Sequence, residues 1–343
     1  MVSPPDEIRD EGGPEARPVA IRPYPLPPEG FDPSTEPEEV LRRYGLPTPE
    51  ETGSNQQTAD FRRAFLQPPP SGVPPRFFRL LAAGATAPPT GIRSVAAPNG
   101  AWPAQKSLNW SGGYITPRDG RSFTSVMAHW TVPEVTEPPG IGALDYHSST
   151  WIGLDGQKFY RDSSLPQIGT RQRFIPGSGP EYRAWFQWWV RGRHLPIWFL
   201  QLPVAVRDEI SAIITVLDET TVRCNLKNVT QGVFLQAFDA FAPPGLRISG
   251  ATAEWIMERP SPLGADGWSP YELPRYTTFP FTEALAESKA PGRAGLQQHG
   301  LEFARLIRMY KITANPTRVR TISTARRLRE PPPPKLELTY VGP

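Results

Sequence analysis

The residues best suited to chemistry are polar side chains inside segments rich in tryptophan and β-branched residues. Gln167 lies in SLPQIGT, Glu254 lies in ATAEWIMERP, and Asp155 follows the segment STWIGL. Carboxyl and amide groups can transfer protons or hold a reacting oxygen. Each also has a structural interpretation, because a glutamine near a strand end often bonds the backbone and a strand glutamate often faces solvent. Residue type alone leaves both interpretations open.

Several common chemistries have no signature in the chain. There is no HExxH, GxSxG, GxxxxGK[ST] or GxGxxG pattern, and the four histidines, His129, His147, His194 and His299, lack the spacing of metal ligands. Cys224 is the only cysteine, so no intrachain disulfide can form. We therefore expect neither a metal nor an organic cofactor. A serine triad stays open, since no local pattern marks one.

The segments that must position these residues have the period-two pattern of strands. Between residues 106 and 260, short runs of Trp, Tyr, Phe, Val and Thr alternate with Gly and Pro turns, which favours an all-β sandwich or barrel. Segment 124–132 places Val126, Ala128 and Trp130 on one face. Residues 261–343 continue the pattern less clearly, and we expect a short helix within 294–310.

Segment 182–190 carries aromatic residues on both faces. Alternation places Ala184, Phe186 and Trp188 on one side and Trp185, Gln187 and Trp189 on the other. One face is then expected to pack the core while the other lines a groove. Burial of both faces between layers is the structural alternative.

Residues 1–105 form a separate zone, and the domain proper is expected over 106–343. The chain has 44 prolines, and many of them fall in this first zone, which should be largely irregular. A short helix is expected near 36–44, with Glu38 and Glu39 in its first turn, and a weaker one at 60–66. The zone is either a loose tail, or a prosegment or strap along the domain.

Bulk properties restrict the partners. The net charge is only +3 and the basic residues are scattered, so we expect no nucleic-acid partner. No apolar run approaches the length that spans a membrane, and no membrane partner is expected. The N-terminus shows no Sec signal, so the location stays open between secreted and cytoplasmic. We expect a monomer.

Six motifs in order resemble the eqolisin, or glutamic peptidase, family. They are NWSGGY (109–114), WTVP (130–133), WIGLDG (151–156), PQIGT (166–170), YRAWFQW (182–188) and AEWIMERP (253–260). The resemblance covers about residues 106–343. Residues 31–47 also resemble a stretch of bacterial members.

The resemblance implies a concanavalin A-like β-sandwich of two bent antiparallel sheets, and an endopeptidase acting on polypeptides at acidic pH. By motif position, Glu254 matches the catalytic glutamate, a general base, and Gln167 the glutamine that stabilises the oxyanion. This chemistry needs no metal or cofactor. A noncatalytic sandwich that binds peptide or carbohydrate in the same groove, and a self-inhibited protein with the N-terminal zone in the groove, are the alternatives.

By the same resemblance, the substrate-binding or supporting residues are Trp110, Trp151, Asp155, Trp185 and Gln187. We expect Asp155 to hydrogen-bond near the catalytic pair. Trp110 and Trp185 either wall the groove or pack the core.

The chain also departs from the family pattern. Members commonly carry a glutamate where Gln187 stands, and fungal members carry acidic residues where Arg171 and Arg183 stand. Positive neighbours lower a carboxyl pKa, so we expect a lower pKa for Glu254 than in those members, with a pH optimum above strong acid.

Overall fold

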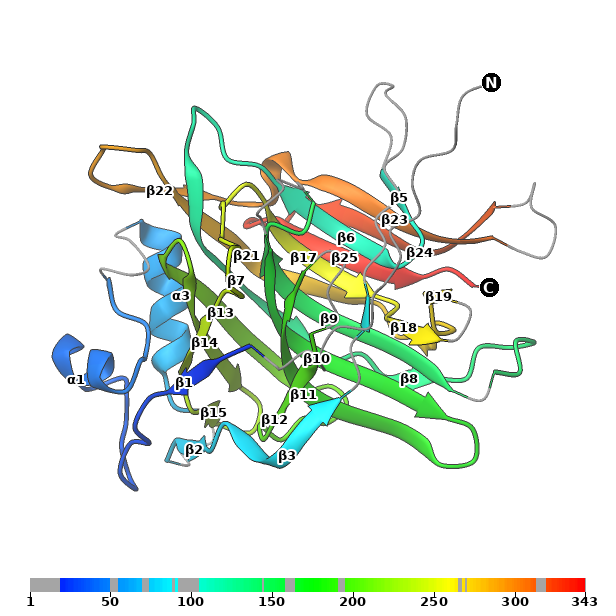
Figure 1. Ribbon diagram of the computed structural model, residues 1–343, viewed down its shortest axis with the longest axis horizontal. Coiled ribbons are helices and arrows are strands. Elements are labelled where there is room, and N and C mark those ends of the chain that lie inside the picture. The colour runs from blue at the N-terminus through cyan, green and yellow to red at the C-terminus, as the bar shows by residue number, and fades with distance from the viewer. Residues whose placement is uncertain are drawn as a thin grey trace.

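The computed structural model describes residues 19–49, 55–69, 74–87, 90–91, 105–143, 145–157, 164–190, 195–264, 267–268, 270–312 and 319–342. The regular secondary structure of these residues is mostly antiparallel β-strand (Figure 1). His194 and the remaining parts of the first 105 residues lie outside the described ranges.

Seven antiparallel strands form what we call the front layer. Their hydrogen-bonded order across the layer is β12 (Ile197–Leu200), β11 (Gly179–Trp189), β10 (Leu165–Ile175), β9 (Tyr146–Leu154), β17 (Ala253–Glu258), β6 (Trp110–Ile115) and β23 (Arg305–Ile312). All three motifs that contain Gln167, Asp155 and Glu254 fall at the centre of this layer or at its strand ends.

The back layer packs behind it. Its order is β21 (Phe279–Lys289), β7 (Ser122–Thr131), β13 (Glu209–Asp218), β14 (Thr221–Asn228), β16 (Phe238–Phe241) and β1 (Ile21–Pro23). Strands β24 (Val319–Leu328) and β25 (Lys335–Tyr340) join β23 to β21. The predicted β-sandwich is confirmed. Its two layers are joined through β24 and β25 into one continuous hydrogen-bonded sheet.

Short elements complete the architecture. They are the helices α1 (Glu38–Arg43), α3 (Gln56–Leu66) and η1 (Leu301–Phe303) and the strands β2 (Arg76–Phe78), β3 (Leu81–Ala87), β4 (Thr90–Gly91), β5 (Gln105–Ser107), β8 (Val135–Thr136), β15 (Val233–Leu235), β18 (Ser261–Gly264), β19 (Gly267–Trp268), β20 (Arg275–Tyr276) and β22 (Leu296–His299). Helix α1 lies where a short helix is expected, and the 60–66 helix is confirmed as part of α3.

The main core lies between the two layers. Val126, Ala128 and Trp130 of β7 are buried in it, as the alternation predicts. Front-layer residues meet them, among them Ile168 and Trp255, whose indole Nε1 donates to the Met127 carbonyl at 3.1 Å. Because successive strand residues face opposite sides, the alternate residues of the front layer point away from this core.

Helix α3 covers the outer face of the back layer, beside β13, β14 and β21 (Figure 1). Phe61 and Phe65 pack against Ile213 and Leu285 of that face. Lys227 donates to the Phe65 carbonyl at 2.8 Å and thereby helps to satisfy the helix C-terminus. The described residues 19–49 and 55–69 thus pack on the back layer.

The prediction of a short α-helix within 294–310 is wrong. The chain there forms β22, the single 3-10 turn η1 and then β23. Ile307 pairs with Gly112 of β6 and is buried on the front layer. Sheet pairing with a distant segment therefore overrides the local helical spacing.

Candidate active site

Gln167 and Glu254 occupy one row of the front layer. The register pairs Gln187 with Gln167, Gln167 with Gly153, Gly153 with Glu254, and Glu254 with Tyr114. Directly opposite residues project to the same face, so all four side chains share the side that points away from the main core. Gly153 adds no side chain between the pair, whose strands are about 10 Å apart.

The Glu254 carboxyl is held by backbone donors at one oxygen. Its Oε1 accepts from the N–H groups of Gly156 at 3.0 Å and Gln157 at 3.2 Å. Its Oε2 is buried and has no hydrogen-bond partner among the residues that the structure describes. Such a carboxyl is fixed in direction and keeps one oxygen available to a reacting group.

Burial raises the pKa of Glu254 to about 8, the hydrogen bond with Thr252 opposes the rise, and the charge of Asp155 adds to it. Arg171 and Arg183, expected to depress this pKa, are not among the main influences. Desolvation outweighs the effect of the arginines here.

Two amides in series orient Gln167. Its Nε2 donates to Gln187 Oε1 at 3.1 Å, and Gln187 Nε2 donates to the Leu195 carbonyl at 2.9 Å. Gln167 Oε1 is buried with no partner within the described part of the chain. An amide has two N–H donors, so Gln167 presents one further N–H and one free acceptor.

Asp155 supports the strand that carries the glutamate. Its carboxyl accepts from the backbone N–H groups of Ser249, Gly250 and Ala251 at 2.5, 3.1 and 2.6 Å. Asp155 has a φ of 69°, a left-handed conformation that these bonds compensate. These three bonds hold the loop that leads into β17, and the charge of Asp155 contributes to the raised pKa of Glu254.

The tryptophans pack around the pair. A methyl group built on Gly153 would lie 3.0 Å from the Trp151 ring, and one on Gly156 would lie 2.8 Å from the Trp110 ring. Trp185 lies in the next row, opposite Gly169. All three tryptophans are buried, in a cluster distinct from the main core. Residues 184–188 are buried on both faces, which matches the structural alternative and not the expected division into a core face and a groove face.

Two residues on this face escaped the sequence analysis. Glu258 is fully buried, accepts the Trp151 indole N–H at 2.8 Å, and has a pKa raised to about 8 by burial. Tyr114 stands opposite Glu254. The signal for Glu258 is its place four residues after Glu254 in one strand, which period-two alternation assigns to the same face.

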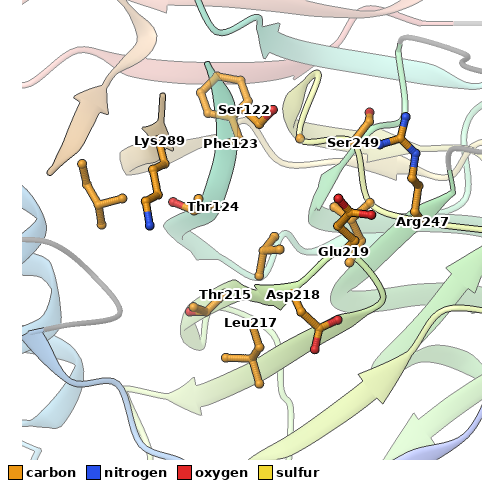
Figure 2. A pocket seen from close by; sticks show the side chains of 14 residues that line it. Ser122, Phe123, Thr124, Thr215, Leu217, Asp218, Glu219, Arg247, Ser249 and Lys289 are labelled. Atoms are coloured by element: carbon orange, nitrogen blue, oxygen red, sulfur yellow. The ribbon is translucent and has the colours of Figure 1, made fainter. Parts of the chain in front are cut away.

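The pair is closed to solvent in this conformation. The exposed fractions of Gln167 and Glu254 are 1% and 0%. The pocket in Figure 2 lies elsewhere, between β7, β13 and the loop at Arg247–Gly250. Within the described ranges no group of His, Cys, Asp and Glu could hold a metal ion, and no helix is long and apolar enough to cross a membrane.

Comparison with known proteins identifies a matching family and a similar fold. The family model described as Peptidase A4 family matches residues 108–326. No curated protein matches the chain. The fold is similar to SCP-B, a member of the eqolisin family of peptidases, in a complex with the tripeptide Ala-Ile-His, with 18% identity, a TM-score of 0.50, and coverage of 68% of this chain and 98% of that one. The fold is also similar to that of scytalido-glutamic peptidase with a transition-state analogue inhibitor. The sequence identity is 18%, the TM-score is 0.52, and the match covers 68% of this chain and 98% of that one.

Proposed function

Because the chain belongs to the Peptidase A4 family, we propose that it is an endopeptidase in which Glu254 and Gln167 together direct one water molecule at a peptide carbonyl. The observation that carries the proposal is their shared row on one face, where each keeps one buried oxygen without a partner among the described residues. A water molecule needs two to four polar partners in such a place, and these two oxygens supply two.

The reaction balances without further groups. Ionised Glu254 removes a proton from water as the water oxygen bonds to the carbonyl carbon. The free N–H of Gln167 donates to the oxyanion that forms, a contribution of about 10²–10³ in rate. Glu254 then returns the proton to the amide nitrogen as the C–N bond breaks, which leaves an acid and an amine.

The neighbours keep both groups in position. The amides of Gly156 and Gln157 bind Oε1 of Glu254 and direct Oε2 to the water. Gln187 takes one N–H of Gln167 and leaves the other for the oxyanion. A glutamine at 187 suits this role because its own amide is anchored at Leu195.

Burial determines the protonation of the base. With a pKa of about 8, Glu254 is protonated in acid, and its ionised form becomes common only near pH 8. We propose a pH optimum above the strongly acidic range. The reacting conformation must also open the pair to water and substrate, since both side chains are closed here.

That same burial favours the second candidate, a noncatalytic sandwich that binds peptide or carbohydrate. In such a protein the ligand binds in the groove without admitting water to the pair, and Glu254 stays a neutral structural group. Cleavage itself separates the two candidates.

The test is digestion of a denatured protein across pH 2–8. Wild type is expected to cleave it, and Glu254→Gln and Gln167→Ala are each expected to lose about 10²-fold or more. Glu39→Gln, an exposed glutamate of α1, is the matched control and should keep full activity. A wild-type protein that cleaves nothing at any pH would leave the binding candidate.

A further inference from the structure

Two arginines lie on the same face as Gln167 and Glu254, at one end of it. Arg171 follows Gln167 by four residues in β10, and Arg183 precedes Gln187 by four in β11, where the register pairs the two arginines. Alternation puts all of them on one side. Their Cα atoms lie about 13 Å along the strands from the Gln167 row.

Both guanidinium groups lie over the ring of Phe199, Arg171 at 4.6 Å and Arg183 at 5.4 Å from its centroid. Phe199 is the cross-strand partner of Trp185, which stands only one row from Gln187. The charged ends therefore extend from their own row towards the pair. A guanidinium stacked on an aromatic face keeps its N–H edges free for an anion.

The acidic groups nearby do not neutralise this cluster. Arg173 forms an ion pair with Asp145, and its Nε and Nη2 donate to the carboxylate at 2.9 and 2.8 Å. Glu181 lies 3.5 Å from Arg173 and 3.8 Å from Arg171. Among the described residues, Arg183 has no ion pair.

Two further titratable neighbours, His147 and Tyr271, add no positive charge above acid pH, and burial raises the pKa of Tyr271, which stays neutral. His147 contacts Asp145 at 2.8 Å, and burial lowers the pKa of His147 to about 4. Burial, and then the charge of Arg183, lower the pKa of Arg171 to about 10, which still leaves it positive below neutral pH. Its Nε is buried with no partner in the described chain. Two carboxylates thus face three arginines.

We propose that Arg171 and Arg183 form a subsite for a carboxylate side chain, Asp or Glu, of the polypeptide substrate. The planar fork of arginine matches a carboxylate in a bidentate contact, which a neutral amide reproduces poorly. This proposal rests on the proposed peptidase function, and it specifies substrates with an acidic residue near the cleaved bond.

The position of the acidic residue follows from the rows. An extended peptide advances about 7 Å for every two residues, the same spacing as the rows of the sheet. The guanidinium groups lie between the row next to the pair and the row after it. The acidic residue therefore stands two to four residues from the cleaved bond, on one side of it.

The experiment compares peptides that differ only in Glu against Gln, scanned from four residues before the cleaved bond to four after it. Wild type is expected to show about tenfold higher kcat/KM for Glu at a position on one side. Arg183→Gln and Arg171→Met should bring the ratio near one, and Arg183→Glu should reverse it, so that the Gln peptide is cleaved faster. Arg326→Gln, an exposed arginine of β24 paired with Glu337, should keep the wild-type ratio.

The pH dependence adds a second readout. The preference for Glu should vanish below about pH 4, where the substrate carboxyl is protonated and the arginines are still charged. Equal cleavage of Glu and Gln peptides by wild type, or a preference that survives in both arginine variants, overturns the subsite and leaves the peptidase activity standing.

Absence of all cleavage overturns the proposed function instead. In that case the same peptides are titrated into the Glu254→Gln protein and followed by tryptophan fluorescence. Tighter binding of the Glu peptide that is lost on adding Arg183→Gln supports the subsite, and equal binding of the two peptides overturns it.

Discussion

Replacing Glu258 by glutamine should flatten the dependence of stability on pH. The pKa of Glu258 is about 8 in the folded protein against 4.5 for an ordinary glutamate. Between these values the unfolded chain has released the proton that the folded chain still holds. Unfolding therefore releases a proton, and stability falls as pH rises through this window.

The size of the effect follows from the two pKa values. One such carboxyl costs about 1 kcal/mol of folding free energy at pH 5 and about 4 kcal/mol at pH 7.5. Glutamine has no charge to desolvate, and its Oε1 can still accept the Trp151 indole N–H, which lies 2.8 Å from the present carboxyl. Glu258→Gln should therefore gain about 3 kcal/mol on wild type between pH 5 and 7.5.

Urea denaturation at the two pH values measures this gain. The control is Glu39→Gln, whose exposed carboxyl should leave the wild-type dependence unchanged. If Glu258→Gln and wild type lose stability in parallel between pH 5 and 7.5, the folded protein does not hold Glu258 as a neutral acid, and the reasoning about burial on this face fails.

Three further predictions test other parts of the structure. Phe61→Ala should cost about 3–5 kcal/mol in urea denaturation, because the Phe61 ring is fully buried and stacks on His129 at 4.4 Å; a loss below 1 kcal/mol would mean that α3 is not docked. The kcat/KM should rise with pH towards about 8, because the ionised form of Glu254 is the base, and a maximum at pH 2–3 would refute this. Gly153→Ala should lower stability by about 1–3 kcal/mol, since its methyl would meet Leu165 at 2.8 Å, and an unchanged melting temperature would show that the row is loosely packed.

Alternation predicted the strands well where one face is strongly apolar. The β7 residues Val126, Ala128 and Trp130 face the core as expected. The expected helix within 294–310 failed because Ile307 takes its conformation from pairing with β6. Local spacing carries no information about such a distant partner.

The candidate pair could be identified from motifs, but not its surroundings. Sequence placed Gln167 and Glu254 in separate strands, and only the register through Gly153 shows that they share a row. The rise of the Glu254 pKa to about 8 by burial could not be predicted either, because desolvation depends on what covers the face. Asp155 bonds the loop at 249–251, a partner that no local pattern indicates.

The N-terminal zone was ambiguous in sequence for a physical reason. A proline-rich composition suits both a loose tail and a strap. Phe61 and Phe65, one helical turn apart, give the local signal that α3 has an apolar side. The division of the chain at residue 105, the prosegment and the monomeric state stay predictions. Mass spectrometry of acid-incubated, active protein that retains residues 19–69 would favour the strap.

The cooperation of Gln167 and Glu254 is tested most directly by a double-mutant cycle on peptide cleavage. Since both groups act on one water molecule and one oxyanion, the Gln167→Ala/Glu254→Gln protein should be no slower than the slower single variant by more than about threefold. Losses that simply multiply, so that the double variant falls a further 10²-fold or more, would show that the two side chains act independently and would contradict the shared site.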